Sequence, residues 1–261
     1  MTIVSSQRTH SSSRRGYKPH KVVPYQPSSE LKQARGTAQG RRSANALSKP
    51  LMNSRSRCTT LALQNWRHLA LSNRIGLIAD THMPGTLASL WPSALAYLQG
   101  CDAILHAGDL HTLDVVDELS TIAPVYVSEG NGDIGIIDER VKPAWSLTFG
   151  SFSIGMVHHC PSPERKSESF VKEKLSKHFT ELPDVIIFGH THLEMVHQYG
   201  DLTLVNPGSP TLPRNQALQL GTLGELIIDQ NKATIRLVQL TDEAWETHSQ
   251  YATFTISKNV A

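Results

Sequence analysis

Long apolar runs and regularly spaced cysteines are both missing from this chain of 261 residues. No run approaches the roughly 18–20 apolar residues that a membrane-spanning helix needs, and no apolar secretory segment follows Met1. The three cysteines, Cys58, Cys101 and Cys160, are odd in number and widely spaced, which favours neither a disulfide framework nor a CxxC metal clip. We therefore expect no membrane contact and a reducing compartment, with the cytoplasm as the first expectation.

Acidic residues are nearly absent from the beginning of the chain. Residues 1–79 have 14 Lys and Arg but a single acid, Glu30, whereas residues 80–261 have 11 Lys and Arg against 22 acids. Residues 1–58 are also poor in aliphatic side chains and rich in Ser, Gly and Arg, a composition that buries too little surface to offset chain entropy. We expect a basic, disordered extension over residues 1–58.

Several roles are compatible with this extension. Its Arg- and Ser-rich, acid-poor composition resembles an organellar transit segment, which would change the compartment. A basic arm also attracts nucleic acid without sequence preference. A solvated tail and an over-extended translation start are equally simple interpretations. The sequence leaves these alternatives open, and it leaves open whether the protein forms a homo-oligomer.

The rest of the chain has the pattern of a folded α/β domain. Leucines and Trp66 at helical spacing predict a linking helix over residues 59–73. From Arg74 onward, apolar β-branched runs alternate with helical stretches, which indicates a layered α/β domain over residues 74–240. The expected helices lie near Thr86–Leu98, Leu113–Leu119 and Glu164–His178. Residues 241–261 form a C-terminal tail without a recognisable motif.

The last third of the domain changes character. Short strand patterns follow one another with little helix between them. They cover Leu202–Val205, Leu223–Ile228 and Thr234–Leu240. We expect these strands to form a second, more antiparallel sheet that packs on the first.

Five apolar runs end abruptly at side chains that can bind a metal ion. Asp, Asn and His are costly in a buried strand unless they face a cleft or an ion. In open α/β sheets, ligands bind beyond the carboxyl ends of the strands. One polar site is therefore expected where the strand ends converge. The residues concerned are Asp80, His82, Asp109, Asn131, His158, His190 and His192.

The combination of these residues is more informative than any one of them. A single Asp-x-His, Gly-Asp or Asn-Gly is common in turns. Seven metal-compatible residues in five segments with the same order make a mononuclear or binuclear metal site the better interpretation. Carboxylate, amide and imidazole ligands without thiolate favour Mn²⁺, Fe²⁺, Ni²⁺ or Zn²⁺ over a structural cysteine–zinc site.

Six motifs, in this order, carry a resemblance to a known family. They are IGLIADTH, HAGDL, EGNGD, MVHH, FGHTH and NPGSPTLPR. Over residues 74–240 the chain resembles the calcineurin-like metallophosphoesterases, in particular the small bacterial and archaeal phosphodiesterase branch related to the vacuolar sorting subunit Vps29. The resemblance implies a four-layer α/β-sandwich with two mixed β-sheets flanked by helices.

The resemblance also implies two divalent metal ions, with Mn²⁺ as the first expectation and Ni²⁺, Fe²⁺, Zn²⁺ or Mg²⁺ as alternatives. The first ion would be held by Asp80, His82, Asp109 and His192. The second would be held by Asp109, Asn131, His158 and His190. The same seven residues would be the catalytic set, with a metal-bridging hydroxide that attacks a phosphodiester substrate.

The motifs also leave alternatives open. Larger relatives have a histidine directly after the asparagine, where this chain has Gly132; without that general acid, esters with good leaving groups are favoured. A phosphomonoesterase and a non-catalytic Vps29-like protein-binding scaffold are the other interpretations. Asn131, His159 and Arg214 are the expected substrate contacts, since Arg214 could bind a phosphate bidentately. His106 could orient Asp109 or contact the substrate, although a strand-end histidine with a satisfied hydrogen bond is the first expectation. Asp133 could support the site from behind the ligands or stabilise the turn.

Overall fold

The structure is a computed structural model that describes residues 72–215 and 220–258. All the described residues belong to one compact unit. The extension expected over residues 1–58 lies outside the described residues. The linking helix expected over residues 59–73 also lies outside them, apart from its last two residues. These two, Ser72 and Asn73, belong to the first strand and not to a helix. Within the described part of the chain, no helix is long and apolar enough to cross a membrane.

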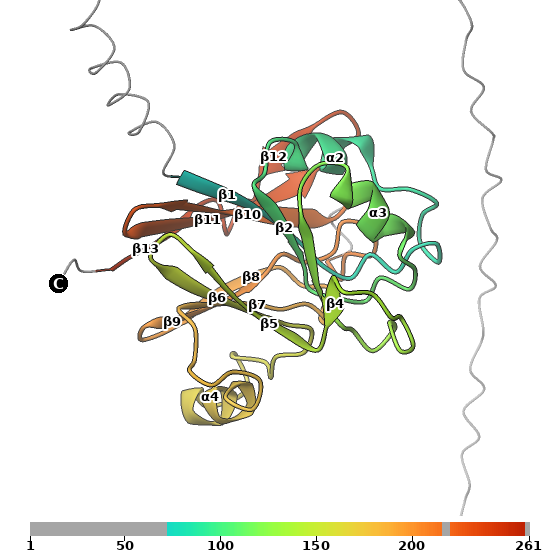
Figure 1. The fold of residues 1–261 in the computed structure, drawn as a ribbon. Helices are drawn as coiled ribbons and strands as arrows, with labels where there is room; N and C mark the ends of the chain where they lie inside the picture. Colours follow the sequence, from blue (N-terminus) through green and yellow to red (C-terminus); the bar gives the residue numbers. More distant parts are fainter. Residues whose placement is uncertain (1–71, 216–219, 259–261) are drawn as a thin grey trace, which may run out of the picture. The chain divides into compact units, whose positions relative to one another are not determined.

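The first sheet is mixed (Figure 1). Strands β1 to β4 run parallel to one another, whereas β10 pairs antiparallel with β1 and continues into an antiparallel ribbon. The order is β12-β11-β10-β1-β2-β3-β4, and β13 also pairs with β11. Its strands are β1 (Ser72–Ile78), β2 (Ala103–His106), β3 (Val125–Ser128), β4 (Val141–Lys142), β10 (Thr222–Asp229), β11 (Lys232–Leu240), β12 (Trp245–Thr247) and β13 (Phe254–Ser257).

The second sheet is mixed as well. Its central strands β6, β7 and β9 are parallel, and β5 and β8 close its two edges as antiparallel strands. The order is β5-β6-β7-β9-β8. Its strands are β5 (Ala144–Phe149), β6 (Phe152–Val157), β7 (Val185–Ile187), β8 (Met195–Tyr199) and β9 (Leu202–Asn206).

The assignment of the late strands to the second sheet was wrong for two of the three. Only β9 lies there, whereas β10 and β11 extend the first sheet beside β1. The physical reason is burial on both faces: Leu223 packs under the helices, while Leu226 and Ile228 face the other sheet. A strand buried on both sides suits the place next to β1, and its apolar pattern does not reveal which sheet it joins.

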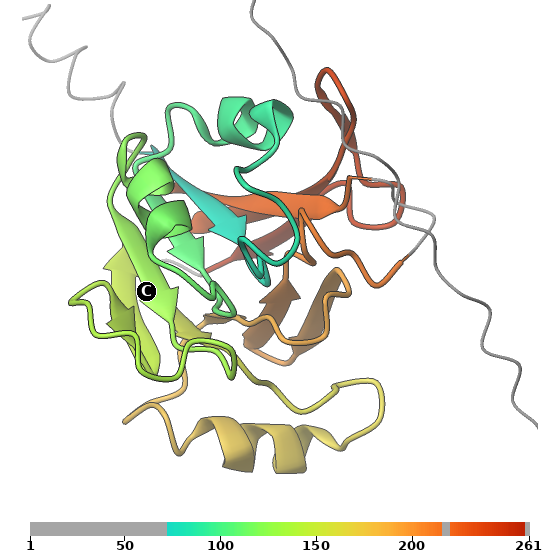
Figure 2. The ribbon, with the colours of Figure 1, turned by 90° about the vertical axis from the view of Figure 1, so that its right-hand side faces the viewer.

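Three helices cover the outer faces of the sheets in the described residues (Figures 1 and 2). Helices α2 (Pro92–Leu98) and α3 (Asp114–Ser120) pack on the first sheet, and α4 (Glu168–Leu175) packs on the second. Helix α2 is shorter than the expected Thr86–Leu98 because Pro92 stands at its first turn, and proline disfavours helical conformation in the residue before it. Helix α4 begins after Ser167, whose hydroxyl accepts the Phe170 N–H at 3.4 Å.

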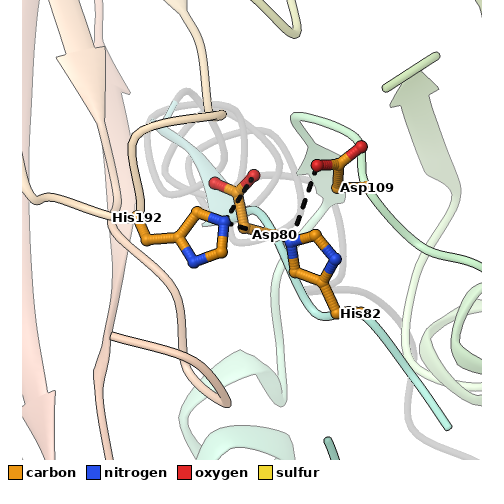
Figure 3. Close-up of side chains that lie close together, drawn as sticks. All are labelled: Asp80, His82, Asp109 and His192. Carbon is orange, nitrogen blue, oxygen red and sulfur yellow. Dashed lines mark hydrogen bonds and ion pairs between the residues drawn. The ribbon is translucent and has the colours of Figure 1, made fainter. Parts of the chain in front are cut away.

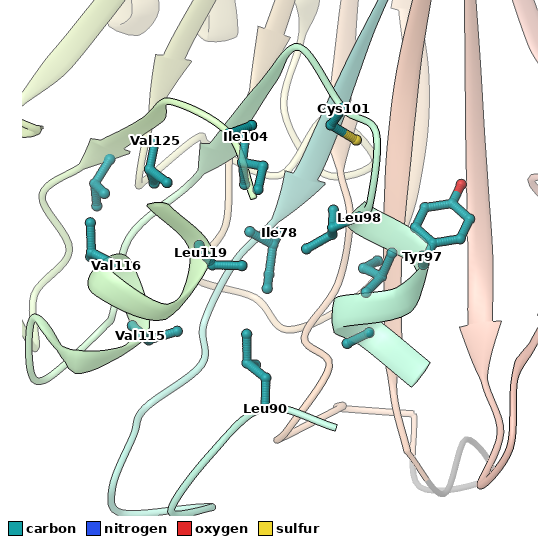
Figure 4. Packing of buried hydrophobic residues seen from close by; sticks show 14 of the residues in the cluster. Ile78, Leu90, Tyr97, Leu98, Cys101, Ile104, Val115, Val116, Leu119 and Val125 are labelled. Carbon is teal, nitrogen blue, oxygen red and sulfur yellow. The ribbon is translucent and has the colours of Figure 1, made fainter. Parts of the chain in front are cut away.

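Three apolar clusters separate four layers. Alternate residues of a strand point to opposite faces, so Ile78 packs under α2 and α3 while its neighbour Leu77 faces the second sheet (Figure 4). Met156 lies between the two sheets, and Ile186 packs with α4 on the outer side. The four-layer α/β-sandwich with two mixed sheets is therefore confirmed. The loops that follow β1, β2, β3, β6 and β7 carry the seven residues expected at the site.

Candidate metal centre

The structure brings the expected acidic and imidazole side chains together in two groups that share Asp109. Within each group, one ligand atom per residue lies within 4.8 Å of all the others. The first group, drawn in Figure 3, is Asp80, His82, Asp109 and His192, and the second is Asp109, His158 and His190. The seventh residue, Asn131, joins the second group, since its Oδ1 lies 3.0 Å from His190 Nδ1 and 3.2 Å from His158 Nε2.

Left-handed backbone is concentrated in this region. Of the seven non-glycine residues with positive φ in the described part of the chain, only Gln230 lies elsewhere. The other six are Asp80, His82, Asp109, His111, His190 and His192. Such conformations cost roughly 1–2 kcal/mol each and cluster where function requires them. The loops therefore hold strain that aims these side chains inward.

Two glycines allow the loops to approach closely. Gly108 has a φ of 91°, and a Cβ there would collide with the Ser128 carbonyl oxygen and lie 2.8 Å from His158 Nδ1. A Cβ at Gly130 would collide with the backbone nitrogen and carboxylate of Asp109. Side chains at either position would push Asp109 and His158 apart.

Backbone carbonyls fix the orientation of two imidazoles. His158 Nδ1 donates to the Ala107 carbonyl oxygen at 2.7 Å, and His192 Nδ1 donates to the Leu212 carbonyl oxygen at 2.8 Å. In both rings Nε2 then faces a carboxylate, at 3.4 Å from Asp109 Oδ2 for His158 and 3.8 Å from Asp80 Oδ1 for His192. A carbonyl on one ring nitrogen and a free lone pair on the other is the usual environment of a metal-binding histidine.

His82 is oriented by another imidazole, His111. His82 Nδ1 lies 2.9 Å from His111 Nε2, and His82 Nε2 lies 3.0 Å from His192 Nε2 and 3.5 Å from Asp109 Oδ2. Two imidazole lone pairs at this distance repel each other unless a proton or a cation lies between them. Our reading of the sequence did not single out His111. The signal was available, because Asp109-Leu-His111 repeats the spacing of Asp80-Thr-His82.

The carboxylate of Asp80 also requires a cation or a proton. It is fully buried; Oδ1 accepts the His190 N–H at 2.9 Å, and Oδ2 has no partner among the described residues. Burial raises the pKa of Asp80 to about 7, although the charge of His158 and the His190 N–H oppose the shift. A buried oxygen without a partner, aimed into a group of imidazoles, fits a metal ion.

The pKa of Asp109 is shifted in the opposite direction to that of Asp80. Burial would raise its pKa, but hydrogen bonds from His158 and from the Gly132 N–H outweigh burial and hold the pKa below its usual range. Burial lowers the pKa of His82 and of His190, which leaves both rings neutral and able to offer lone pairs at neutral pH. An ionised carboxylate and neutral imidazoles are the protonation states that metal binding needs.

His106 and Asp133 have the structural roles that we expected. His106 Nε2 lies 3.1 Å from Thr81 Oγ1, and its Nδ1 accepts the Gly108 N–H at 3.1 Å. Burial lowers the pKa of His106 to about 4, so the ring is neutral. Asp133 is also fully buried and accepts four backbone N–H groups of the loops around Asp109.

A cavity of about 490 Å³, which we call the centre pocket, opens beside the second group. Asn131 and His159, two of the three expected substrate contacts, line it together with His158 and His190. The ring of His159 lies edge-on to that of His190 with centroids 4.9 Å apart. The third expected contact, Arg214, donates its backbone N–H to the His192 carbonyl, but its side chain makes no hydrogen bond or ion pair with the described residues. It lines a different cavity.

Comparison with known proteins agrees with this architecture. A probable metallophosphoesterase of Methanothermobacter thermautotrophicus is 36% identical over 144 residues, which are 54% of this chain and 78% of that protein. One of Methanocaldococcus jannaschii is 29% identical over 54% of this chain and 69% of its own length. Among solved structures, Vacuolar Protein Sorting 29 of Cryptosporidium parvum shares the fold with a TM-score of 0.59 and 20% identity, covering 72% of this chain and all of that one.

A family model also matches most of the domain. The model describes the calcineurin-like phosphoesterase superfamily domain, and it aligns with residues 74–227, from β1 into β10. The match includes all seven residues of the centre. The chain belongs to the calcineurin-like phosphoesterase superfamily.

Proposed function

We propose that this protein is a binuclear metal-dependent phosphodiesterase. The observation that carries the proposal is the sharing of Asp109 between the two groups of side chains, because a carboxylate common to both can bridge two ions. Membership of the family supports a phosphoesterase that binds divalent metal. The binuclear centre and the preference for diesters are our inference. Two divalent ions would exceed the charge of Asp80 and Asp109 and attract an anionic ester.

Each residue has a defined task in this mechanism. Asp80, His82 and His192 would hold the first ion, Asn131, His158 and His190 would hold the second, and Asp109 would contribute to both. When bound, the two ions supply an activated water and positive charge for the phosphoryl oxygens. His159 closes one wall of the pocket over Asn131, where the ester would lie. Mn²⁺ is the metal we expect first, because the oxygen and nitrogen ligands without thiolate suit it.

Gly132 favours diesters over monoesters. A side chain at this position would point at the ring of His111, since a Cβ would lie 2.6 Å from His111 Cδ2 and 3.3 Å from Asp109 Oδ1. Glycine leaves this place without a side-chain acid next to Asn131. Among diesters, those with a good leaving group need such protonation least, so we expect them to turn over fastest.

The test is metal-dependent hydrolysis of bis(p-nitrophenyl) phosphate and of p-nitrophenyl phosphate. Metal-stripped protein is reloaded separately with Mn²⁺, Ni²⁺, Zn²⁺ and Mg²⁺, and bound metal is counted by mass spectrometry. We expect about two ions per chain and dominant turnover of the diester. Asp109→Ala should lose both ions together, whereas His192→Ala should reduce binding of one.

Other outcomes lead to other functions. Dominant monoester turnover would make the protein a phosphomonoesterase despite Gly132. Two bound ions with no turnover of either ester would favour the scaffold interpretation. Binding of a single ion that survives Asp109→Ala would contradict the binuclear centre itself.

A further inference from the structure

A second cavity, of about 480 Å³, lies beside helix α4, and we call it the lysine pocket. Its walls come from the segment between β6 and β7. They are His159, Pro161, Ser162, Lys166, Phe170, Lys174, Leu175, Lys177 and His178. Its volume is in the range of small-molecule sites. None of the functions above uses this cavity.

The walls of the lysine pocket are positively charged. Three lysines and two histidines contribute to it, and no acidic residue does among those described. Lys166 Nζ and Lys174 Nζ lie 5.3 Å and 5.2 Å from the centre of the same ring, Phe170. An aromatic face within about 6 Å attracts an ammonium group, so the ring keeps both charges at the cavity. Phe170 is itself 36% exposed, so the ring is accessible to a molecule in the cavity.

The two acids of helix α4, Glu168 and Glu173, do not line the lysine pocket. Glu168 pairs with Lys172 at 2.7 Å, and neither residue lines the lysine pocket. Glu173 lies 4.0 Å from Lys174, at the limit of an ion pair, and its side chain is 66% exposed. The positive cavity contrasts with residues 80–261 as a whole, which carry 11 Lys and Arg against 22 acids. Local charge of this kind attracts an anion against the general field of the domain.

The lysine pocket adjoins the centre pocket. His159 and His178 line both this cavity and the centre pocket, whose other walls include Asn131, His158 and His190. A molecule with its reacting phosphate at the centre would therefore pass His159 and His178 before it reaches Lys174. An uncharged extension would gain nothing from three ammonium groups, whereas a second phosphate would.

We propose that the lysine pocket is a second phosphate subsite and that the substrate is a phosphodiester with a further phosphate group, such as a 5′-phosphorylated dinucleotide. The role of the lysine pocket as a substrate subsite rests on the proposed phosphodiesterase function, because the diester itself would lie at the metal centre. The subsite makes contacts at a distance from the reacting atoms, so it lowers KM and leaves kcat unchanged.

The experiment compares two dinucleotides that differ only in the terminal phosphate, pTpT and TpT. Binding is measured by calorimetry on metal-stripped protein, in which the centre cannot hydrolyse either one. Hydrolysis of both is measured on the metal-loaded protein. The variants are Lys166→Gln, Lys174→Gln and Lys177→Gln, alone and combined. Lys172→Gln is the matched control, since it removes the same charge from the same helix outside the cavity.

We expect pTpT to bind about five- to tenfold more tightly than TpT and to have a lower KM by a similar factor. The triple variant should lose this preference, and Lys172→Gln should keep it. Equal affinity for the two dinucleotides, or an equal loss in Lys172→Gln, would overturn the subsite. If the preference in binding is lysine-dependent but neither the dinucleotides nor bis(p-nitrophenyl) phosphate are hydrolysed, the phosphate site stands and the phosphodiesterase proposal fails. If both dinucleotides are hydrolysed with equal KM, the phosphodiesterase proposal stands and the phosphate subsite fails.

Discussion

The carboxylate of Asp133 lies against the backbone of Asp109 and accepts its N–H at 2.8 Å. The same carboxylate accepts the N–H groups of Leu110 at 2.7 Å, His111 at 3.0 Å and Gly130 at 2.8 Å. A carboxylate has about four acceptor positions, so this one is saturated by backbone donors. Asp133 therefore joins the loop after β2 to the loop after β3 and holds Asp109 in its left-handed conformation.

The first prediction concerns this connection. In Asp133→Asn, an amide NH₂ replaces one oxygen and faces two backbone donors, so two charge-assisted hydrogen bonds are lost in a buried site. We expect the free energy of unfolding of the metal-free protein to fall by about 2–4 kcal/mol, measured by urea denaturation. Asp201→Asn, the same change in an exposed turn, should stay within about 0.5 kcal/mol of the unchanged protein. Equal stability of the two variants would show that Asp133 does not hold the loops.

The centre could be predicted from sequence because its signal is local. Each ligand follows directly on an apolar run, as Asp80 follows β1 and His158 follows β6, and the carboxyl ends of parallel strands meet at one edge of a sheet. The layers could be predicted for a similar reason, since strand and helix periods are visible within a few residues. The resemblance of the motifs then supplied the pairing of ligands with ions, which spacing alone does not give.

The remaining features depend on contacts between distant parts of the chain. Strand β10 contains a continuous apolar run, Leu226 to Ile228, and only its register with β1, Leu226 opposite Ile75, places it in the first sheet. Short edge strands such as β4 and β12 show no apolar alternation because they have only two and three residues, none of which is buried. The lysine pocket is equally invisible in the sequence, where Lys166 and Lys174 are separated from one another by Glu168 and Glu173.

The second prediction concerns His111. Metal binding through His82 Nε2 requires the proton on Nδ1, and His111 Nε2 accepts the hydrogen bond of that proton at 2.9 Å. His111→Ala should weaken metal binding by about tenfold in a chelator competition assay. His111 is exposed, so the stability of the metal-free protein should change little. His197→Ala on β8 is the control, and an equal loss of affinity there would refute the role of His111.

The third prediction links His111 to Gly132. A Cβ on residue 132 would lie 2.6 Å from His111 Cδ2 and 2.7 Å from His111 Nε2, so Gly132→Ala must displace the ring from His82. We expect Gly132→Ala to lower metal affinity by the same factor as His111→Ala. The double variant should be no weaker than either single variant, because both changes break one hydrogen bond. Additive losses in the chelator assay would mean that Gly132 acts on the centre by another route.

The last prediction concerns the pH dependence of stability in the metal-free protein. The Asp80 carboxyl loses its proton near pH 3.8 in the unfolded chain, but burial raises its pKa in the folded protein to about 7. Between these values the unfolded state holds fewer protons than the folded state, so this group destabilises the fold as the pH rises from about 4 to 7. Asp80→Asn removes the titration. In excess chelator at pH 8, we expect the variant to be more stable than the unchanged protein by about 1–2 kcal/mol, although it no longer binds metal.

Asp184→Asn should change the stability in the opposite direction in the same urea denaturation series. Burial would raise the pKa of Asp184, but hydrogen bonds from Lys258 and Ser153 outweigh it and lower the pKa, so its contribution to stability is present at neutral pH and lost in acid. Asp184→Asn should therefore destabilise the protein at pH 8, where Asp80→Asn stabilises it. With saturating metal, the unchanged protein should become more stable than Asp80→Asn, because only the unchanged carboxylate gains a cation. The order of the unchanged protein and Asp184→Asn should stay the same. A metal-free Asp80→Asn protein that is less stable at pH 8 than the unchanged chain would mean that the buried Oδ2 already has a favourable partner, and the case for a cation at that oxygen would fall.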